Sequence, residues 1–456
     1  MPDLRVAFYG DDFTGSVDAL LQFARAGWRG RLFVGHPGPD ALVRDAAGAD
    51  VIGIAGVARS LSADAIDEEV RPALEGLRRL HPAVVQYKAC STADSSPTVG
   101  SLGRVIEIGR KVFGPLTVPV LVAQPDFGRY TVFGHHFAAE EGIVYRLDRQ
   151  PTMSNHPVTP MHEADLARHL SRQTALPIGS LDFTAYADAA ATSRTLRDRT
   201  DAATVLDAMD DRHVALVGRA VAAMHQDEPV LAIGSGGLSA GLAHALTPAA
   251  DGAPGNAPDG ATGHETPSVV GAGLGTAGPV LAVSGSRSPQ TARQVAHAVE
   301  HGWTELDLPV GSGPFEDVTS SALDELAAGR SVVVSTVRAQ VEGADDLVER
   351  IAVGLAAVVR AALVSGTTRR VVVCGGDTSS RVVTLLGAES LEIAANPFGN
   401  VVVCRVSAPE SWLDGADVLL KGGQVGPVDL FETVRRLDAT AASRPGRGGP
   451  STSVQR

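Results

Sequence analysis

Short runs of β-branched and other apolar residues alternate along this chain with segments whose apolar residues recur every three or four positions. The first series of runs is Leu4–Tyr9, Arg31–Val34, Val51–Ile54, Ala83–Tyr87, Val118–Val122 and Ile143–Leu147. A second series is Pro229–Ile233, Val280–Val283, Val332–Ser335, Val371–Cys374, Val401–Cys404 and Val418–Leu420. Buried strands that alternate with amphipathic helices are typical of βαβ units. The pattern therefore predicts an α/β fold with mostly parallel sheets.

The length of 456 residues predicts more than one such domain, because single domains usually hold about 150 residues. We expect two α/β domains, residues 1–225 and 226–438, each with a mostly parallel sheet flanked by helices and with a ligand cleft between them. In residues 247–278, 12 of 32 residues are Gly or Pro. This segment is expected to be a flexible insertion, and residues 439–456 a disordered tail, because neither can bury enough apolar surface to offset its ordering entropy.

Charge and cysteine content exclude several classes of protein. The formal net charge of −13 predicts no general affinity for nucleic acid or for an anionic membrane surface. Three cysteines without a C-x-x-C pair support neither a disulfide framework nor a cysteine zinc site. Without a signal-like N-terminus or an apolar run long enough for a membrane span, a cytoplasmic protein is expected. Self-association into a homo-oligomer is compatible with this interpretation.

The loop Gly10–Ser16 follows the first predicted strand directly and leads into a predicted helix. Ligands bind at such turns in open parallel sheets, because strand carboxyl ends and helix N-termini converge there. Of its two adjacent carboxylates, Asp11 and Asp12, one can accept a proton from a sugar hydroxyl and the other can hold Mg²⁺ or orient its neighbours. The alternative is that Asp12 merely caps the helix. The presence of Thr14 and Gly15 next to the two aspartates favours a ligand-binding loop. The aspartate spacing does not fit the D-x-D-x-[TV] pattern of haloacid-dehalogenase phosphatases.

Further polar donors follow other strands of the first predicted domain. Lys88 leads into a stretch rich in hydroxyls that includes Ser91, and its ammonium suits a substrate carboxylate or a transferring phosphoryl group. The alternative for Lys88 is a solvated strand end. Arg59 and Arg129 also lie after predicted strands. A small acid is the expected ligand. The histidines show no metal-ligand spacing, so the metal ligands remain unassigned.

Three glycine turns follow strands of the second predicted domain, at Ser284–Pro289, Gly375–Ser380 and Lys421–Gly426. Glycines let the backbone approach a phosphate, and a helix N-terminus presents free N–H groups with a partial positive charge. Each turn alone is a weak signal, but three in one domain indicate a nucleotide. The chain has neither a G-x-x-x-x-G-K-[ST] loop nor a G-x-G-x-x-G after a strand, so a P-loop enzyme is excluded and a dinucleotide enzyme disfavoured.

These motifs together resemble the four-carbon acid sugar kinase family over nearly the whole chain. The resemblance rests on Asp11–Gly15, Tyr87–Ser96, Ser284–Ser286, Gly375–Ser379 and Lys421–Gly423. It implies an N-terminal domain that binds an acid sugar, a C-terminal domain that binds ATP with Mg²⁺, and phosphoryl transfer from one to the other.

The resemblance and the residue chemistry together assign roles to individual residues. We expect Asp12 to accept the proton, with Asp11 second, and Lys88 to act as a charge clamp. Asp377 stays open as an alternative base. The expected substrate contacts are Thr14, Arg59, Ser91 and Arg129. The expected nucleotide contacts are Ser284, Gly285, Ser286, Gly375, Gly376, Asp377, Thr378, Gly422 and Gly423.

Departures from the family pattern bear on the substrate. Cys90–Thr92 resembles the branch that acts on 3-oxo acids. At Gln124–Gly134 this chain differs from the segment that much of the family has in the same place. We therefore expect 3-oxo-isoapionate or 3-oxo-tetronate as substrate, with D-threonate or D-erythronate as the alternative. A non-catalytic nucleotide-binding sensor of the same fold stays open. An NAD-dependent dehydrogenase ranks last, because the paired aspartates would repel a pyrophosphate.

Overall fold

The computed structural model describes residues 4–248, 274, 278–309, 314–336, 346–399, 401–409 and 411–437. The chain divides into two compact units. Unit 1 comprises Met1–Pro267 with Ala388–Glu392, and unit 2 comprises Ser268–Gly387 with Ile393–Arg456. The predicted insertion at 247–278 lies almost entirely outside the described residues, and the predicted tail at 439–456 lies wholly outside them.

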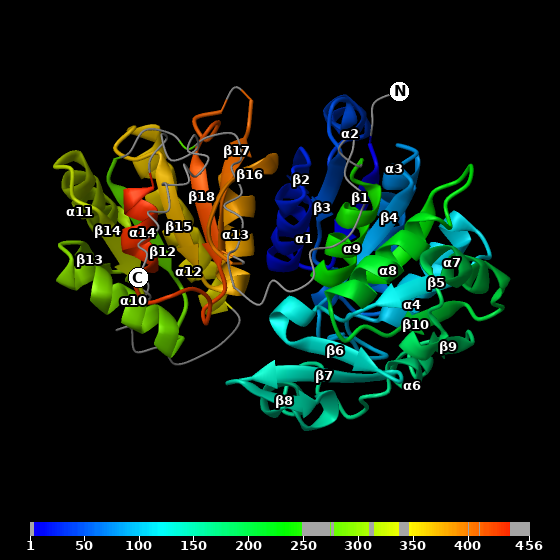
Figure 1. Ribbon diagram of the computed structural model, residues 1–456. Helices are drawn as coiled ribbons and strands as arrows, with labels where there is room; N and C mark the ends of the chain where they lie inside the picture. Colours follow the sequence, from blue (N-terminus) through cyan, green and yellow to red (C-terminus); the bar gives the residue numbers. More distant parts are fainter. Residues whose placement is uncertain are drawn as a thin grey trace, which may run out of the picture. The chain divides into compact units, whose positions relative to one another are not determined.

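Unit 1 is built on a parallel sheet with the strand order β2-β3-β1-β4-β11-β5-β10-β9 (Figure 1). The strands are β1 (Val6–Gly10), β2 (Gly30–Val34), β3 (Val51–Ala55), β4 (Val84–Lys88), β5 (Val118–Leu121), β9 (Ile178–Leu181), β10 (Ala203–Leu206) and β11 (Val230–Gly234). Ser390 and Leu391, which also belong to unit 1, pair antiparallel with β2. The central strands β1, β3, β4 and β11 are buried along their whole length, as expected for a sheet covered on both faces.

Helices connect these strands. They are α1 (Phe13–Arg25), α2 (Pro39–Ala46), α3 (Ala65–Arg78), α4 (Leu102–Phe113), α5 (Pro151–Ser154), α6 (Leu166–Ser171), α7 (Ala189–Asp198), α8 (Asp211–Ala222) and α9 (Gly236–Leu246), with short 3₁₀ turns η1 (Ala58–Ser60), η2 (Pro125–Phe127), η3 (Leu147–Arg149) and η4 (Phe183–Ala185). Because each parallel connection returns through a helix, the turns that follow the carboxyl ends of β1, β3 and β4 meet at one edge of the sheet.

A small antiparallel sheet projects from unit 1 and corrects one prediction. It contains β6 (Arg129–Val132), β7 (His135–Glu140) and β8 (Ile143–Arg146). The run Ile143–Leu147 was predicted to be a buried strand of the parallel sheet, but β8 pairs only with β7 among the described strands, and Ile143 and Val144 are exposed. The reason is the tight turn before β8, in which Glu141 and Gly142 both have positive φ, so the chain doubles back as a hairpin.

The position of β11 also differs from the expectation. The run Pro229–Ile233 was expected to open the second domain at residue 226, but β11 lies between β4 and β5 in unit 1. The side-chain amide of Gln86 on β4 fixes this position, because it donates to the carbonyl oxygens of Gly234 and Ser235. Buried strands of both sheets are apolar, so the sequence of such a strand alone does not indicate which sheet it joins.

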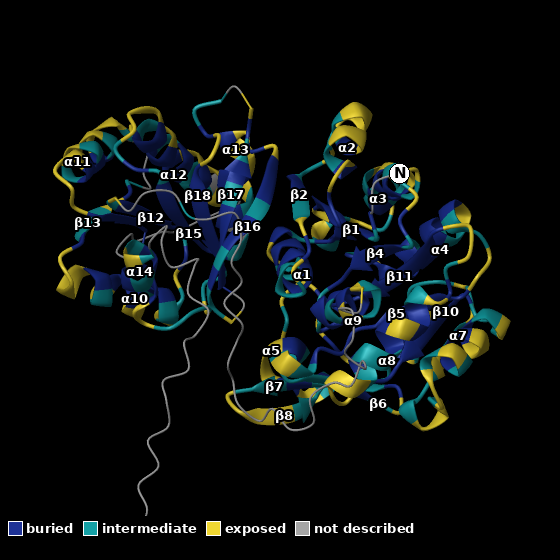
Figure 2. Ribbon diagram, turned by 45° about the horizontal axis from the view of Figure 1, so that its top comes forward, coloured by how far each residue is buried: buried dark blue, intermediate teal, exposed yellow. Residues whose placement is uncertain are grey.

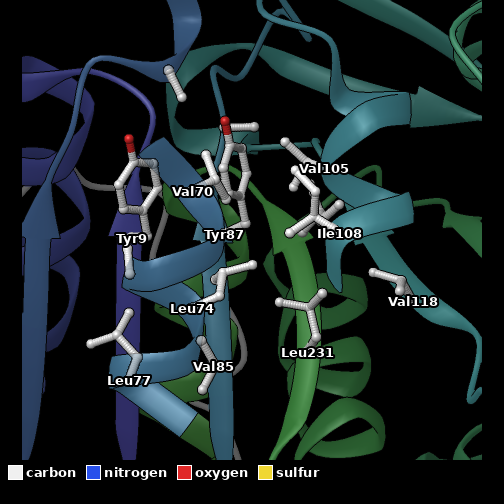
Figure 3. Packing of buried hydrophobic residues seen from close by; sticks show 14 of the residues in the cluster. Tyr9, Val70, Leu74, Leu77, Val85, Tyr87, Val105, Ile108, Val118 and Leu231 are labelled. Carbon is white, nitrogen blue, oxygen red and sulfur yellow. The ribbon is translucent and has the colours of Figure 1, made fainter. Parts of the chain in front are cut away.

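The main core of unit 1 lies between the sheet and the helices α3 and α4 (Figure 3). Along α3 the buried residues recur at helical spacing, and they include Val70, Leu74 and Leu77. Burying each such side chain contributes roughly 1.5–3 kcal/mol. Tyr9 and Tyr87 stack in this core with ring centroids 5.6 Å apart, and their hydroxyls point toward the same end of the strands. The turns that follow β1 and β4 are thus supported by the packed core beneath them.

Unit 2 contains a second, mixed sheet with the order β13-β14-β12-β15-β18-β17-β16. Its strands are β12 (Val280–Ser284), β13 (Thr304–Asp307), β14 (Val332–Ser335), β15 (Arg370–Cys374), β16 (Ser390–Phe398, whose first three residues belong to unit 1), β17 (Val401–Ser407) and β18 (Asp417–Lys421). Its helices are α10 (Pro289–Glu300), α11 (Glu316–Ala327), α12 (Asp346–Val364), α13 (Gly376–Leu386) and α14 (Leu430–Arg436). The neighbouring strands β13, β14, β12, β15 and β18 are parallel, and β17 is antiparallel to β18.

The predicted fold class, mostly parallel sheets flanked by helices, is confirmed. In both units the central strands of the sheet are buried, whereas the outer faces of the helices are exposed (Figure 2). In the part of the chain that the structure describes, no helix has both the length and the apolar character needed to cross a bilayer.

Candidate active site

The turn between β1 and α1 presents two carboxylates at the edge of the unit 1 sheet. Asp12 has an extended backbone and is the N-cap of α1, because its Oδ1 accepts the Gly15 amide at 2.9 Å. Ser16 Oγ donates to the Asp12 carbonyl at 2.6 Å. Asp12 therefore caps α1, but the cap bond occupies only one of its two carboxylate oxygens.

Arg59, on η1 after β3, joins these carboxylates into one cluster. Its Nη2 donates to Asp11 Oδ1 at 2.7 Å and to Asp12 Oδ1 at 2.8 Å. Its backbone amide donates to the Asp11 carbonyl at 3.0 Å. Burial raises the pKa of Asp11 above its usual value, although Arg59 opposes that shift. Burial also opposes the charge on Arg59, but the two aspartates raise the pKa of its guanidinium well above the usual range. Arg59 is therefore a permanent cation.

Lys88 lies beside this cluster at the carboxyl end of β4, opposite Gly10 in the parallel register. The ammonium is buried and donates to the Ala89 carbonyl at 3.0 Å. A Cβ placed on Gly15 would lie 3.0 Å from Lys88 Nζ, 3.6 Å from Arg59 Nη2 and only 2.4 Å from Asp12 Oδ1. A side chain at Gly15 would therefore fill the space beside both cations at the N-terminus of α1. This arrangement can bind a small carboxylate.

Three turns meet in the same way at the edge of the unit 2 sheet. They follow β12, β15 and β18, whose last residues Ser284, Cys374 and Lys421 lie side by side in the parallel register. A Cβ on Gly285 would lie 2.6 Å from Thr378 Oγ1, and one on Gly375 would lie 3.0 Å from the same atom. Gly375 also has φ +118°, which favours glycine.

Hydroxyl groups gather around the carbonyl oxygen of Gly423 in the third turn. It accepts hydrogen bonds from Ser288 Oγ, from Thr291 Oγ1 at 2.7 Å and from Lys421 Nζ at 3.4 Å. A Cβ on Gly423 would lie 2.5 Å from Ser286 Oγ. Ser288 is the N-cap of α10, and Pro289 is its first residue. Glycine turns, hydroxyls and helix N-termini in this combination can bind phosphate.

Comparison with known proteins agrees with this division of chemistry. The family model described as a sugar-binding N-terminal domain matches residues 6–242, and the one described as a nucleotide-binding C-terminal domain matches residues 281–431. The chain is 38% identical to the 3-oxo-isoapionate kinase of Paraburkholderia graminis, over 95% of this chain and 94% of that protein. The chain belongs to the four-carbon acid sugar kinase family.

Other members of the acid sugar kinase family are more distant. The 3-oxo-tetronate kinases of Methylobacterium radiotolerans and Burkholderia multivorans are 32% and 30% identical, over 96% and 94% of this chain and 100% and 97% of theirs. Crystal structures of proteins from Salmonella typhimurium LT2 and Haemophilus influenzae share the fold. Their TM-scores are 0.75 and 0.72 at 23% identity, and the matches cover 95% and 94% of this chain and 99% of each of theirs.

Two histidines support the loop that carries Ser91 in this family member, and sequence reasoning missed this role. His136 Nε2 donates to the Ser91 carbonyl at 2.8 Å while its Nδ1 bonds to Thr131 Oγ1 at 3.0 Å. His169 Nε2 bonds to Ser95 Oγ at 2.9 Å. Burial lowers the pKa of both histidines to about 4, so both are neutral at pH 7. The sequence of β7 gave no signal of this role, because its residues do not alternate between polar and apolar; the structure puts His136 on the buried face of the strand.

Two predicted substrate contacts are not hydrogen-bonded to the Asp11–Arg59 cluster among the described residues. Arg129 Nη1 donates to the carbonyls of Phe127, at 2.9 Å, and Ala139, at 3.0 Å. Thr14 is exposed at the start of α1. Their contacts with substrate, and that of Ser91, stay predictions.

The predicted nucleotide residues take different positions in their turns. Ser284 is fully buried and its hydroxyl accepts the Ser286 amide at 3.2 Å, so it shapes the turn. Gly376 begins α13. Gly422 directly precedes Gly423, whose carbonyl oxygen accepts the hydrogen bonds described above. The side chain of Asp377 lies outside the described residues, so its role as a base or nucleotide contact stays a prediction. Among the described side chains, no group of three or more His, Cys, Asp or Glu residues could hold a metal ion.

Proposed function

We propose that this chain is an ATP-dependent kinase that phosphorylates a hydroxyl of 3-oxo-isoapionate. Kinase activity on a small acid sugar follows from its family and from the names of its relatives. One observation carries the choice of substrate: the identity is 38% to a 3-oxo-isoapionate kinase but 32% and 30% to two 3-oxo-tetronate kinases, over similar lengths. We place the enzyme in the cytoplasm, where free thiols such as its three cysteines persist.

The geometry of unit 1 supports a division of labour on the acceptor side. Arg59 and Lys88 would bind the substrate carboxylate, since both cations lie beside Gly15, which has no side chain to fill the space next to them. Asp12 is favoured over Asp11 as the proton acceptor, because the side chain of Asp12 is 30% exposed and that of Asp11 only 2%. Asp11 would instead hold Arg59 in position through their 2.7 Å contact.

The geometry of unit 2 supports ATP binding at the three glycine turns. The turns at Gly285, Gly375 and Gly423 would bind a phosphate chain, because they lead to the N-termini of α10 and α13 and carry hydroxyl donors. Mg²⁺ in kinases is held by phosphate oxygens, waters and one or two carboxylates, so it needs no cluster of three acidic residues. When bound, it would neutralise charge on the transferring phosphoryl group.

An ADP-release assay tests the proposal directly. The purified chain is supplied with Mg-ATP and, separately, with 3-oxo-isoapionate, 3-oxo-tetronate, D-threonate and D-erythronate. We expect acid-dependent ADP release with the highest kcat/KM for 3-oxo-isoapionate, by about tenfold, because one additional or missing hydroxymethyl group gives discrimination of roughly this size. Faster turnover of another acid would contradict the substrate assignment. Nucleotide binding without turnover of any acid would identify a sensor.

A further inference from the structure

Lysine is rare in this chain, and its distribution is informative. Of the 39 lysines and arginines, only Lys88, Lys111 and Lys421 are lysines. Lys111 is exposed on α4, whereas Lys88 and Lys421 are buried at the carboxyl ends of β4 and β18. Almost every basic residue on the surface is an arginine. The two buried lysines therefore lie where a compact point charge fits and a planar guanidinium does not.

The ammonium of Lys421 has only neutral partners among the described residues. It is 2% exposed and donates to Thr291 Oγ1 at 3.0 Å and to the Gly423 carbonyl at 3.4 Å. No described carboxylate lies within ion-pair distance of it. Burial lowers the pKa of Lys421, which Cys374 opposes. A buried charge without a counter-ion costs free energy, so this site favours an anion.

The surroundings of Lys421 supply the other parts of an anion site. The hydroxyls of Ser286, Ser288 and Thr291 lie around the Gly423 carbonyl. The N-terminus of α10 follows Ser288 and adds partial positive charge. The close approach of Ser286 Oγ to Gly423 leaves no room there for a side chain.

We propose that Lys421 Nζ binds a phosphate group of the nucleotide. This inference rests on the proposed function and adds to it the one cation of the described nucleotide turns that is buried without an acidic partner. The Thr291 hydroxyl positions the ammonium, and the Ser286 and Ser288 hydroxyls beside it share the contact with the phosphate. An arginine at this position would collide with the turn at Gly423, because the ammonium already reaches both Thr291 and Gly423.

A structural role for Lys421, in which it merely ties the turn after β18 to α10, makes the opposite prediction for stability. Removing a structural tie lowers the melting temperature. Removing an uncompensated buried charge leaves the melting temperature of the ligand-free protein unchanged or raises it. Thermal unfolding of Lys421→Met without ligand therefore separates the two roles.

Calorimetric titration tests the phosphate contact. Adenosine, AMP and ADP are titrated into the wild type, Lys421→Met and the exposed control Lys111→Met. We expect Lys421→Met to raise the Kd for ADP by about 10- to 100-fold, as for the loss of a charge-assisted hydrogen bond. Its Kd for adenosine should stay within about twofold, and Lys111→Met should match the wild type.

Several outcomes would overturn the inference. These are an unchanged Kd for ADP in Lys421→Met, or an equal loss for adenosine and ADP together with a lower melting temperature. Inorganic pyrophosphate should bind the wild type more weakly than ADP; tighter binding would overturn the assignment to a nucleotide. The titration needs no acid sugar, so a failure of the acid panel contradicts the proposed function and leaves the Lys421 result standing.

Discussion

The two sheet edges have the same architecture but different chemistry. In each unit, parallel strands end in turns that lead into helix N-termini. At the unit 1 edge the side chains are charged and paired, with Arg59 held between Asp11 and Asp12. At the unit 2 edge they are glycines and hydroxyls around the single ammonium of Lys421. The fold thus provides the position of a site, and the side chains decide which charge it accepts.

This difference fits two different ligands. At the unit 1 edge, two cations face two carboxylates, so little net charge remains and a singly charged small acid is suited to it. At the unit 2 edge, an ammonium with no acidic partner among the described side chains and two helix N-termini favour a ligand with several negative charges, such as a polyphosphate. Four predictions test this comparison.

Asp12→Asn should have the largest effect. Asparagine can still cap α1, so the fold should persist. Turnover should fall by about 100-fold or more if Asp12 is the proton acceptor, with little change in the Kd for ADP. Steady-state kinetics measures both. Asp188→Asn is the matched control, because Asp188 caps α7 in the same way and lies outside the cluster. Full activity in Asp12→Asn would exclude Asp12 as the base.

Arg59→Met should weaken acid binding and stability together. We expect KM for the acid to rise by about 10- to 100-fold from the loss of a charge-assisted contact. The free energy of unfolding at pH 8 should fall by about 2 kcal/mol or more, because Asp11 would be left buried without its counter-ion. This loss should shrink at lower pH as Asp11 takes up a proton. Arg78→Met, which removes a surface pair with Glu228, should change neither quantity appreciably.

Gly375→Ala should affect only the nucleotide. The new Cβ would meet Thr378 Oγ1 at 3.0 Å in a backbone with φ +118°. We expect the Kd for ADP to rise by about tenfold, as for the loss of one to two kcal/mol of contact, and that for the acid to stay unchanged. Gly366→Ala is the control, because Gly366 has φ +70° but a Cβ there meets open space. If both variants bind ADP equally well, the turn at Gly375 is not part of the site.

Asp126→Asn should have the smallest effect, and one that depends on pH. The Asp126 side chain is 46% exposed, but its partial burial, followed by the repulsion from Asp18, raises its pKa to about 6, although Arg25 opposes this. A carboxyl whose pKa is raised by folding stabilises the protein below its unfolded pKa of about 4, and this contribution is lost as pH rises through 6. The variant should therefore be more stable than the wild type at pH 7.5, by about 1 kcal/mol after allowance for solvent screening.

Urea unfolding at pH 7.5 and pH 4 measures this difference. The gain in stability of Asp126→Asn should vanish at pH 4, where the wild-type carboxyl is protonated and therefore as neutral as the amide. An advantage of equal size at both pH values would contradict the interpretation. Asp126 lies in unit 1, so the result also shows whether the charged unit carries the pH dependence.

The sequence predicted both sheet edges because local patterns mark them. The Asp11–Asp12 turn and the glycine turns follow strands directly, and the strand-to-helix transition is visible in the spacing of apolar residues. The membership of β11 in unit 1 depends on pairing with β4 and β5, and β8 depends on a hairpin turn. Such pairings join residues far apart in sequence, so local patterns do not contain them.

The supporting residues were harder to predict for the same reason. His136 and His169 bond to Ser91 and Ser95 across separations of 45 and 74 residues. Arg59 reaches Asp11 only because β1 and β3 are neighbours in the sheet. Composition did not reveal these contacts, whereas the chemistry of the individual turns did indicate an acid and a nucleotide.

Hydrogen–deuterium exchange with one ligand at a time tests the central claim most directly. The acid alone should slow exchange in residues 11–16 and 88–96 of unit 1 and leave the unit 2 turns unchanged. ADP alone should slow exchange in residues 284–288, 375–380 and 421–426 and leave the unit 1 turns unchanged. Protection of the same unit by both ligands, or the reverse assignment, would contradict the account.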